Sequence, residues 1–278
     1  MTDASNIQPI KVLSKTTWTD SLFSFTTTRP QGFKFTAGQF VRLGVNPSQL
    51  RHHQSSNTDG TDDDKHSLDE EIFRAYSIVS SPYEDELEFF SVVIPDGAFT
   101  SQLQFLQVED ELLLNPTPFG FLTLARYQLP PPKDLWLLAT GTGVAPFLSM
   151  LQDLPTWQNY ERIILAYSVR TQSELAYAER IEEIAEQFSE LVDNPAKFTF
   201  VPIVTRESMD GALNARLPKL LTEGELEKRV GLKLDPDSSH VMLCGNPQMV
   251  EDTKETLKEM GLTMNRRGEG NIAVENYW

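Results

Sequence analysis

The sequence predicts two domains of different fold class, an antiparallel Greek-key β-barrel followed by an α/β domain with a mostly parallel sheet. Short apolar stretches separated by turn residues fill about the first 115 residues, as in small barrels. After the prolines at 130–132, apolar stretches alternate with amphipathic helical ones, as in parallel sheets covered by helices. A length of 278 residues suits two such domains, and we expect them at residues 1–129 and 134–278.

Six stretches of the first domain are apolar or alternate between apolar and polar residues, which predicts strands. They span 7–15, 22–28, 39–45, 75–81, 87–94 and 111–115. Between the last two, residues 100–108 space Leu103, Leu106 and Val108 as a short helix would. The first domain is therefore expected to hold one short helix among its strands.

Residues 51–71, RHHQSSNTDGTDDDKHSLDEE, interrupt the strand pattern and contain almost no apolar side chains. This composition predicts a solvated acidic loop inserted in the first domain. The alternative is a segment that contacts a partner. His52 and His53 are neighbours in this polar loop, but they are weak grounds for a metal site, and we expect none.

The second domain repeats a strand-then-helix pattern four times. Strands are predicted at 134–140, 162–168, 198–205 and 240–245, with helical stretches at 143–154, 173–188, 217–230 and 247–261. A last strand is predicted at the chain end, IAVENYW, residues 272–278. Such alternation implies a mostly parallel sheet with helices on both faces.

Charge and composition exclude several classes of function. The formal net charge is −16, which argues against nucleic acid as a partner. No apolar run approaches the roughly 18 residues of a membrane helix, and the N-terminus lacks a secretory pattern. The single cysteine, Cys244, excludes internal disulfides and a cysteine-ligated iron–sulfur cluster. These features predict a protein of the reducing cytoplasm that does not contact a membrane.

The stretch ATGTGVAPF, residues 139–147, follows an apolar strand and opens a helix. Gly141 and Gly143 allow a tight turn and close approach of the backbone to a ligand. The helix N-terminus then offers free N–H groups to a phosphate. Pro146 stands where a third glycine of the dinucleotide fingerprint would be, so a nucleotide site and a plain turn both remain open.

The stretch RAYSIVSSP, residues 74–82, places an arginine, a tyrosine and a serine on one predicted strand. Strand alternation puts Arg74 and Tyr76 on one face, with Ser77 on the other. An arginine beside an aromatic ring can hold a pyrophosphate while the ring stacks on a planar group. The alternative is an ordinary arginine on an exposed strand face.

Four motifs then occur in a fixed order, ending in the aromatic terminus VENYW. They are Arg74-Ala75-Tyr76-Ser77, Gly97-Ala98-Phe99-Thr100-Ser101, Gly141-Thr142-Gly143-Val144-Ala145-Pro146 and Cys244-Gly245-Asn246-Pro247. In this combination the chain resembles the ferredoxin–NADP⁺ reductase family, and most of all its bacterial ferredoxin (flavodoxin) reductases. The resemblance covers nearly the whole chain, but the acidic segment 51–71 is longer than is usual in that family.

The resemblance implies that the first domain binds FAD. Tyr76 would stack on one face of the isoalloxazine ring and Arg74 would neutralise the pyrophosphate. Tyr277 would cover the second face of the ring and Trp278 would stack on the adenine, so Tyr277 must move aside when the nicotinamide arrives. The residues implied to contact FAD are Arg74, Ala75, Tyr76, Ser77, Val92, Val93, Ile94, Thr100, Ser101, Tyr277 and Trp278.

The resemblance also implies that the second domain binds NADP(H). The 2′-phosphate needs positive charge, which Arg170 and Arg206 are expected to supply first and Arg216 less directly. The implied NADP(H) residues are Thr142, Gly143, Ser168, Arg170, Arg206, Arg216 and Gly245. Ser77, Cys244, Glu275 and Tyr277 would surround the reacting atoms. Without the resemblance, Cys244 reads as a small buried residue at a strand end and Glu275 as a solvated carboxylate.

The expected activity is electron transfer between NADP(H) and ferredoxin or flavodoxin through FAD, by a monomer. Because those acceptors are acidic, docking needs a local basic patch. Its candidate residues are Lys11, Lys15, Arg29, Lys34, Arg42, Arg266 and Arg267. Alternatives are a flavin reductase or a reductase component for another acceptor such as an oxygenase, a non-catalytic nucleotide-binding regulator, and an interaction protein that uses the acidic loop.

Overall fold

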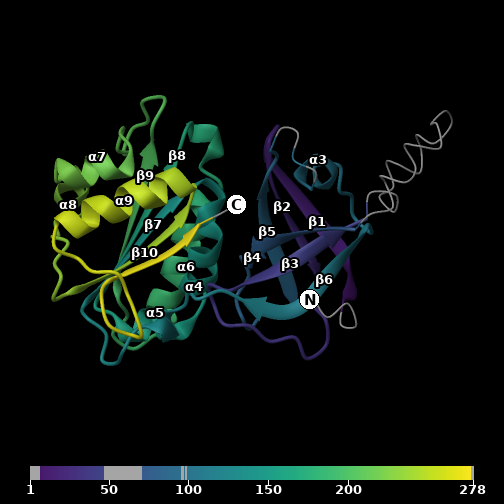
Figure 1. The fold of residues 1–278 in the computed structure, drawn as a ribbon, viewed down its shortest axis with the longest axis horizontal. Helices are drawn as coiled ribbons and strands as arrows, with labels where there is room; N and C mark the ends of the chain where they lie inside the picture. Colours follow the sequence, from purple (N-terminus) through teal and green to yellow (C-terminus); the bar gives the residue numbers. More distant parts are fainter. Residues whose placement is uncertain (1–6, 47–70, 95–96, 98, 277–278) are drawn as a thin grey trace. The chain divides into compact units, whose positions relative to one another are not determined.

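The computed structural model describes residues 7–46, 71–94, 97 and 99–276, and the chain divides into two compact units, Met1–Phe119 and Gly120–Trp278 (Figure 1). The division falls before the proline-rich stretch 130–132. The assignment of one cofactor each to 1–129 and 134–278 stays a prediction.

The first unit is built on a six-stranded antiparallel sheet in the order β4-β3-β6-β1-β2-β5. A further bridge between Ile78 and Phe89, with Val79 donating its N–H to the Glu88 carbonyl at 2.9 Å, joins the two edges of this sheet. The sheet therefore closes on itself, and the predicted antiparallel barrel is confirmed. Its strands are β1 (Gln8–Thr19), β2 (Leu22–Thr28), β3 (Phe40–Val45), β4 (Ile72–Ser77), β5 (Glu86–Val92) and β6 (Glu111–Phe119).

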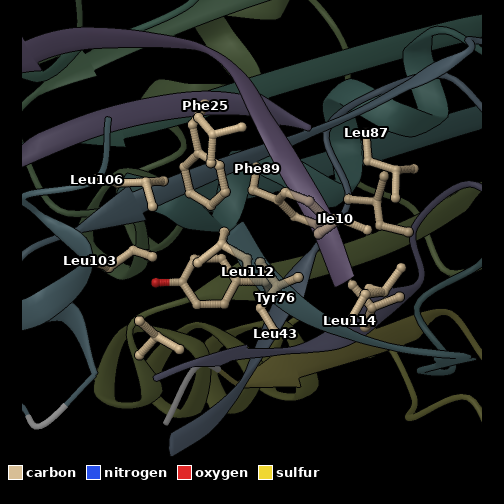
Figure 2. Close-up of a cluster of buried hydrophobic side chains, with 14 of the residues drawn as sticks. Ile10, Phe25, Leu43, Tyr76, Leu87, Phe89, Leu103, Leu106, Leu112 and Leu114 are labelled. Carbon is tan, nitrogen blue, oxygen red and sulfur yellow. The ribbon is translucent and has the colours of Figure 1, made fainter. Parts of the chain in front are cut away.

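The interior of this barrel is a dense apolar cluster (Figure 2). Phe25 and Phe89 lie at its centre with ring centroids 5.5 Å apart. Tyr76 belongs to the same cluster, and its ring lies 5.5 Å from that of Phe99. The inward residues of the six strands thus build one core that fixes where β4 can present its remaining side chains.

The single short helix predicted in the first unit is present as α3 (Thr100–Leu103). Leu103 and Leu106 are buried as expected. Val108 is 47% exposed, because the helix is one turn long and ends at Leu103, five residues before Val108. The helical spacing was therefore correct for two of its three apolar positions.

The second unit contains a five-stranded sheet in the order β11-β10-β7-β8-β9, with every neighbouring pair parallel. This confirms the predicted α/β domain. The strands are β7 (Asp134–Thr140), β8 (Arg162–Val169), β9 (Lys197–Val204), β10 (Ser239–Gly245) and β11 (Ile272–Asn276). The helices are α4 (Ala145–Leu151), α5 (Leu154–Asn159), α6 (Ala178–Leu191), α7 (Leu217–Thr222), α8 (Glu225–Val230) and α9 (Pro247–Glu259).

Helices cover both faces of this sheet. Leu138 and Leu243 on one face pack into a core with residues of α7, α8 and α9, while α4, α5 and α6 occupy the other side (Figure 1). Every residue of β10 is buried, as expected for a central strand covered on both faces. None of the helices in the described part of the chain is long and apolar enough to span a membrane.

Helices in the second unit differ most from the prediction at three places, and α4 is shorter than the predicted 143–154. The stretch 217–230 forms two helices, because Gly224 adopts φ +68° between them. Helix α6 begins at Ala178 instead of 173, because Tyr177 takes a left-handed conformation with φ +64°. Helix α5 was not predicted.

The order in which strands are added to the sheet reverses at β7. From β7 the chain adds β8 and then β9 on one side, whereas β10 lies on the other side of β7 and β11 beyond it. In open parallel sheets, ligands bind outside the carboxyl ends of the two strands at such a switch. Here those strands are β7 and β10, and they end in the two glycine motifs.

Candidate nucleotide-binding and redox site

The glycine turns after β7 and β10 touch each other through their backbones. A Cβ built on Gly143 would lie 2.4 Å from the Cys244 carbonyl oxygen and 2.6 Å from the Cα of Gly245. No side chain fits at such distances. The sequence motif GTG therefore needs its second glycine because another strand end passes directly against it.

Gly245 is constrained in the same way from the opposite side. It adopts φ +135°, and a Cβ there would lie 2.2 Å from the Thr140 Oγ1 atom. That hydroxyl instead accepts a hydrogen bond from the Asn246 N–H at 3.0 Å. Thr140 and the two glycines thus lock the ends of β7 and β10 together. By contrast, a Cβ on Gly141 would meet nothing within 4 Å, so the turn is open there.

Asn246 also begins the helix that follows β10. Its Oδ1 atom accepts hydrogen bonds from the N–H groups of Gln248 at 3.0 Å and Met249 at 3.2 Å, and Pro247 occupies the first turn. In the sequence, Cys244-Gly245-Asn246-Pro247 was identified only as a motif of the family that the chain resembles. Asparagine followed by proline is itself a helix-start signal, so the helix-capping role of Asn246 could have been predicted from the sequence.

The two arginines expected at the 2′-phosphate lie next to each other. Arg170 follows β8 and Arg206 follows β9, and the Arg206 N–H donates to the Arg170 carbonyl at 2.9 Å. Both side chains are exposed. Arg216 precedes α7 and is exposed as well, while Ser168 is buried in β8 opposite Thr140. The structure therefore brings Arg170 and Arg206 together.

Sequence reasoning missed the carboxylates that surround these arginines. Glu174 accepts hydrogen bonds from the Arg170 side chain, and Glu207 accepts one from the Gln172 N–H at 2.5 Å. Only the four-residue spacing of Arg170 and Glu174 signalled a pair in advance. The turn that holds them is not a regular helix, so that spacing alone was a weak signal.

Cys244 and Glu275 lie directly opposite each other at the carboxyl ends of β10 and β11. Cys244 is fully buried and Glu275 is half-buried. The two residues expected near the reacting atoms of the nicotinamide are thus neighbours across one strand pair. The other two members of that set are placed differently: Ser77 belongs to the first unit, and Tyr277 lies outside the described residues, as does Trp278.

In the first unit, Tyr76 is anchored rather than free. Its hydroxyl lies 2.8 Å from the Ser91 Oγ atom, and burial raises the pKa of the phenol well above its usual value. Only 9% of the residue is exposed. Its predicted stacking on a flavin stays a prediction. Ser77 is buried beside it, and Arg74 and Ala75 are exposed.

Arg74 carries an available positive charge on this barrel strand. Its Nη1 atom donates to the Phe73 carbonyl at 2.8 Å, and among the described residues no carboxylate pairs with it. Such a guanidinium suits a phosphate.

Thr100 ties the end of β5 to α3. Its Oγ1 atom accepts from the Ile94 N–H at 3.0 Å. The segment Val92–Ile94 is only partly buried, and Ser101 lies beside Thr100 on the short helix. The predicted flavin contacts of these residues are not tested by the geometry of the unit alone. No cluster of three or more metal-ligating side chains occurs within the described ranges.

A closed antiparallel barrel is followed by a parallel sheet whose switch point is lined with glycines, and in such sheets nucleotides bind at the switch point. Residues 137–255 match the oxidoreductase NAD-binding domain family. The ferredoxin–NADP reductase of Pseudomonas aeruginosa is 40% identical over 98% of this chain and 97% of its own length. The flavodoxin/ferredoxin–NADP reductase of Escherichia coli is 37% identical over 96% and 97%.

Among solved structures, a ferredoxin NADP⁺ reductase from Neisseria gonorrhoeae with bound FAD and NADP superposes with a TM-score of 0.82. It is 36% identical in sequence, and the match covers 98% of both chains. The chain belongs to the ferredoxin–NADP reductase family, and it is an oxidoreductase.

Proposed function

We propose that this protein is a flavoenzyme that passes electrons between NADP(H) and ferredoxin or flavodoxin through FAD. The observation that carries the proposal is the interlocked pair of glycine turns at the switch between β7 and β10. Two backbones meet there with no side chain between them, and the turn at Gly141 is open. This is a cradle for a dinucleotide.

The chain's own groups fit both nucleotides. Arg206 has no carboxylate partner among the described side chains, and its backbone N–H donates to the Arg170 carbonyl, so the two residues could meet one phosphate. Arg74 on the barrel is likewise unpaired within the part that the structure describes, and would hold the pyrophosphate of FAD. FAD supplies the step between two-electron and one-electron chemistry.

The residues near the reacting atoms act by position and polarity. Cys244 is fully buried at the end of β10, and its small side chain would not obstruct a nicotinamide bound there. Glu275, which pairs with Cys244 across β10 and β11, would offer a carboxylate to the ring amide. Ser77 would offer a hydroxyl to the flavin from the barrel side. Proximity and orientation then account for the rate.

The acceptor is proposed to be an acidic protein that docks on a local group of basic residues. Some predicted members of that group are already engaged: Arg29 donates to the carbonyls of Phe33, Pro82 and Glu84, and Lys15 donates to the Gln104 carbonyl at 2.5 Å. Lys11 lies 3.5 Å from Glu109. The side chains of Arg266 and Arg267, adjacent in the second unit, are exposed and are the stronger candidates, and Lys34 is an exposed candidate in the first unit. We also propose that the enzyme is a monomer and cytoplasmic.

A direct test uses the purified full-length protein under anaerobic conditions. We expect a yellow protein whose released flavin is FAD, rapid bleaching by NADPH and slow bleaching by NADH, and transfer of the electrons to ferredoxin or flavodoxin. A colourless protein that takes up no FAD would refute the proposal. Reduction of free flavin but of neither acceptor would favour the flavin-reductase alternative, and nucleotide binding without bleaching would favour a regulator.

The same assay tests the proposed aromatic terminus. A variant that ends at Asn276 lacks Tyr277 and Trp278, and we expect it to retain less FAD and to bind the nicotinamide ring more tightly. Unchanged flavin content and unchanged kinetics would show that these two residues do not cover the cofactor.

A further inference from the structure

The guanidinium of Arg170 is held by one carboxylate. Glu174 accepts from the Arg170 Nε atom at 2.8 Å and also contacts Nη2. The same carboxylate accepts from the backbone N–H of Arg170 at 3.0 Å. One side chain thus binds the main chain and the side chain of the same residue, which restricts the torsions between them.

Within the pair, the Glu174 side chain is mostly buried, whereas the Arg170 side chain is exposed to solvent. The side chain of Glu174 is 18% exposed and that of Arg170 is 53% exposed. Glu174 lies in the 3-10 turn η5 (Gln172–Glu174), where its N–H donates to the Thr171 carbonyl at 3.0 Å and its carbonyl accepts from Ala176 at 2.8 Å. The carboxylate therefore sits on a fixed backbone.

A second carboxylate fixes the same turn to the neighbouring strand end. Glu207 accepts from the Gln172 N–H at 2.5 Å, next to the backbone hydrogen bond between Arg206 and Arg170. The Asn214 side-chain amide in turn donates to the Glu207 carbonyl at 2.5 Å. The two arginine-bearing segments are therefore joined at several points, which sets the spacing of Arg170 and Arg206.

The electrostatics agree with a charged pair. Partial burial acts to raise the pKa of Glu174, but the hydrogen bonds and charge of Arg170 outweigh it, so the pKa is lowered overall. The hydrogen bond that Arg170 donates to Glu174 raises the pKa of Arg170 in return. Both groups are therefore ionised at neutral pH.

We propose that Glu174 is a positioning residue for nucleotide specificity: it holds the Arg170 guanidinium by one edge so that the remaining edge meets the 2′-phosphate of NADP(H). This inference rests on the proposed function. A free arginine would lose side-chain entropy on binding phosphate, whereas Arg170 has already lost most of it. The expected consequence is selective: Glu174 matters for ligands with a 2′-phosphate and not for those without one.

The test measures binding of 2′,5′-ADP and of 5′-ADP by calorimetry to the FAD-loaded full-length protein. We expect Glu174→Ala to weaken 2′,5′-ADP binding roughly fivefold, a ratio equal to about 1 kcal/mol, and to leave 5′-ADP binding unchanged. KM for NADPH should rise by the same factor with kcat unchanged. Glu174→Gln keeps an acceptor oxygen without the charge, and should fall between the wild type and Glu174→Ala.

Two further variants separate the possible failures. Glu223→Ala removes the carboxylate of an exposed pair with Lys219 that has the same four-residue spacing, and it should change neither affinity. Arg170→Ala should weaken 2′,5′-ADP binding more than Glu174→Ala does. If Arg170→Ala has no effect, the proposed phosphate site itself is wrong and Glu174 has no such role. If Arg170→Ala weakens binding and Glu174→Ala does not, or if both ligands weaken equally, only the positioning role is overturned.

Discussion

At the scale of single residues, His240 is held in the second unit by two aromatic neighbours. The ring of His240 stacks on Tyr127 with centroids 3.6 Å apart, and its Nδ1 atom lies 2.9 Å from the Tyr160 hydroxyl. Tyr127 in turn donates to the carbonyls of Val241 at 3.2 Å and Asn271 at 3.0 Å. This cluster ties the start of the unit to β10 through a neutral imidazole.

The same cluster predicts a loss of stability in mild acid. Burial lowers the pKa of His240 to about 4, from 6.5. Between these values the unfolded chain binds a proton that the folded protein does not, so the free energy of unfolding decreases as the pH falls from about 6.5 to about 4. In His240→Asn this dependence should become shallower in that window, although the variant is less stable overall. Chemical denaturation of both proteins from pH 7.5 to 4 measures it, and parallel curves would contradict the assignment.

At the scale of elements, the sequence predicted the strands of the second unit more closely than its helix ends, whereas in the first unit β4 spans Ile72–Ser77 instead of 75–81, and β1 and β6 each run four residues further than predicted. The runs at 134–140 and 240–245 are mostly apolar because both faces of these strands are covered, and each was found within one residue. The start of α6 was missed because Tyr177 adopts a left-handed conformation that its residue type does not announce. Periodicity reports burial, and it does not report which residue ends a helix.

Some residues of the candidate site could be predicted from the sequence and others could not. The glycine turns and arginines were predictable because backbone approach and phosphate binding restrict the residue type. Cys244 and Glu275 were named only through resemblance, and their adjacency follows from β11 pairing with β10, which no local pattern contains. Glu174 and Glu207 were missed because their partners are set by the folding of two loops.

The contact between the two glycine turns predicts that Gly143→Ala weakens NADP(H) binding. In Gly143→Ala the new methyl group would collide with the Cys244 carbonyl, so the ends of β7 and β10 must separate. We expect at least tenfold weaker NADP(H) binding and a loss of roughly 1–3 kcal/mol of stability. FAD content should not change, because the first unit has its own core. Calorimetric titration with NADP⁺ and the absorbance of bound flavin give the two values.

The matched control is Gly141→Ala in the same turn. Its φ of +52° disfavours alanine, but the methyl group would meet nothing within 4 Å. The loss should therefore be limited to the cost of a left-handed residue, about 1–2 kcal/mol, without displacement of Cys244. Equal loss of NADP(H) affinity in the two variants would mean that backbone strain, and not the contact between turns, accounts for the effect.

At the scale of the whole molecule, total charge and local charge act in opposite directions on the proposed acceptor. The formal net charge of −16 repels an acidic protein over long distances. Exposed cations such as Arg266 and Arg267 lie in a tight turn, where the Arg266 N–H donates to the Glu269 carbonyl at 2.7 Å, and attract it at short range. The two effects are screened at different salt concentrations, because the more distant interaction is lost first.

The rate of electron transfer to ferredoxin or flavodoxin should therefore pass through a maximum as salt is added. Low salt leaves the long-range repulsion in place, whereas at roughly 0.1 M the Debye length is about 10 Å and the repulsion is largely screened, with close contacts intact. Higher salt then weakens the docked complex and lowers the rate. Stopped-flow measurement of the second-order rate constant between 10 and 500 mM NaCl gives the curve. If Arg266 and Arg267 form the docking surface, replacing both with Glu should abolish the decrease in rate at high salt. A wild-type rate that only rises with salt would mean that no basic patch guides the acceptor.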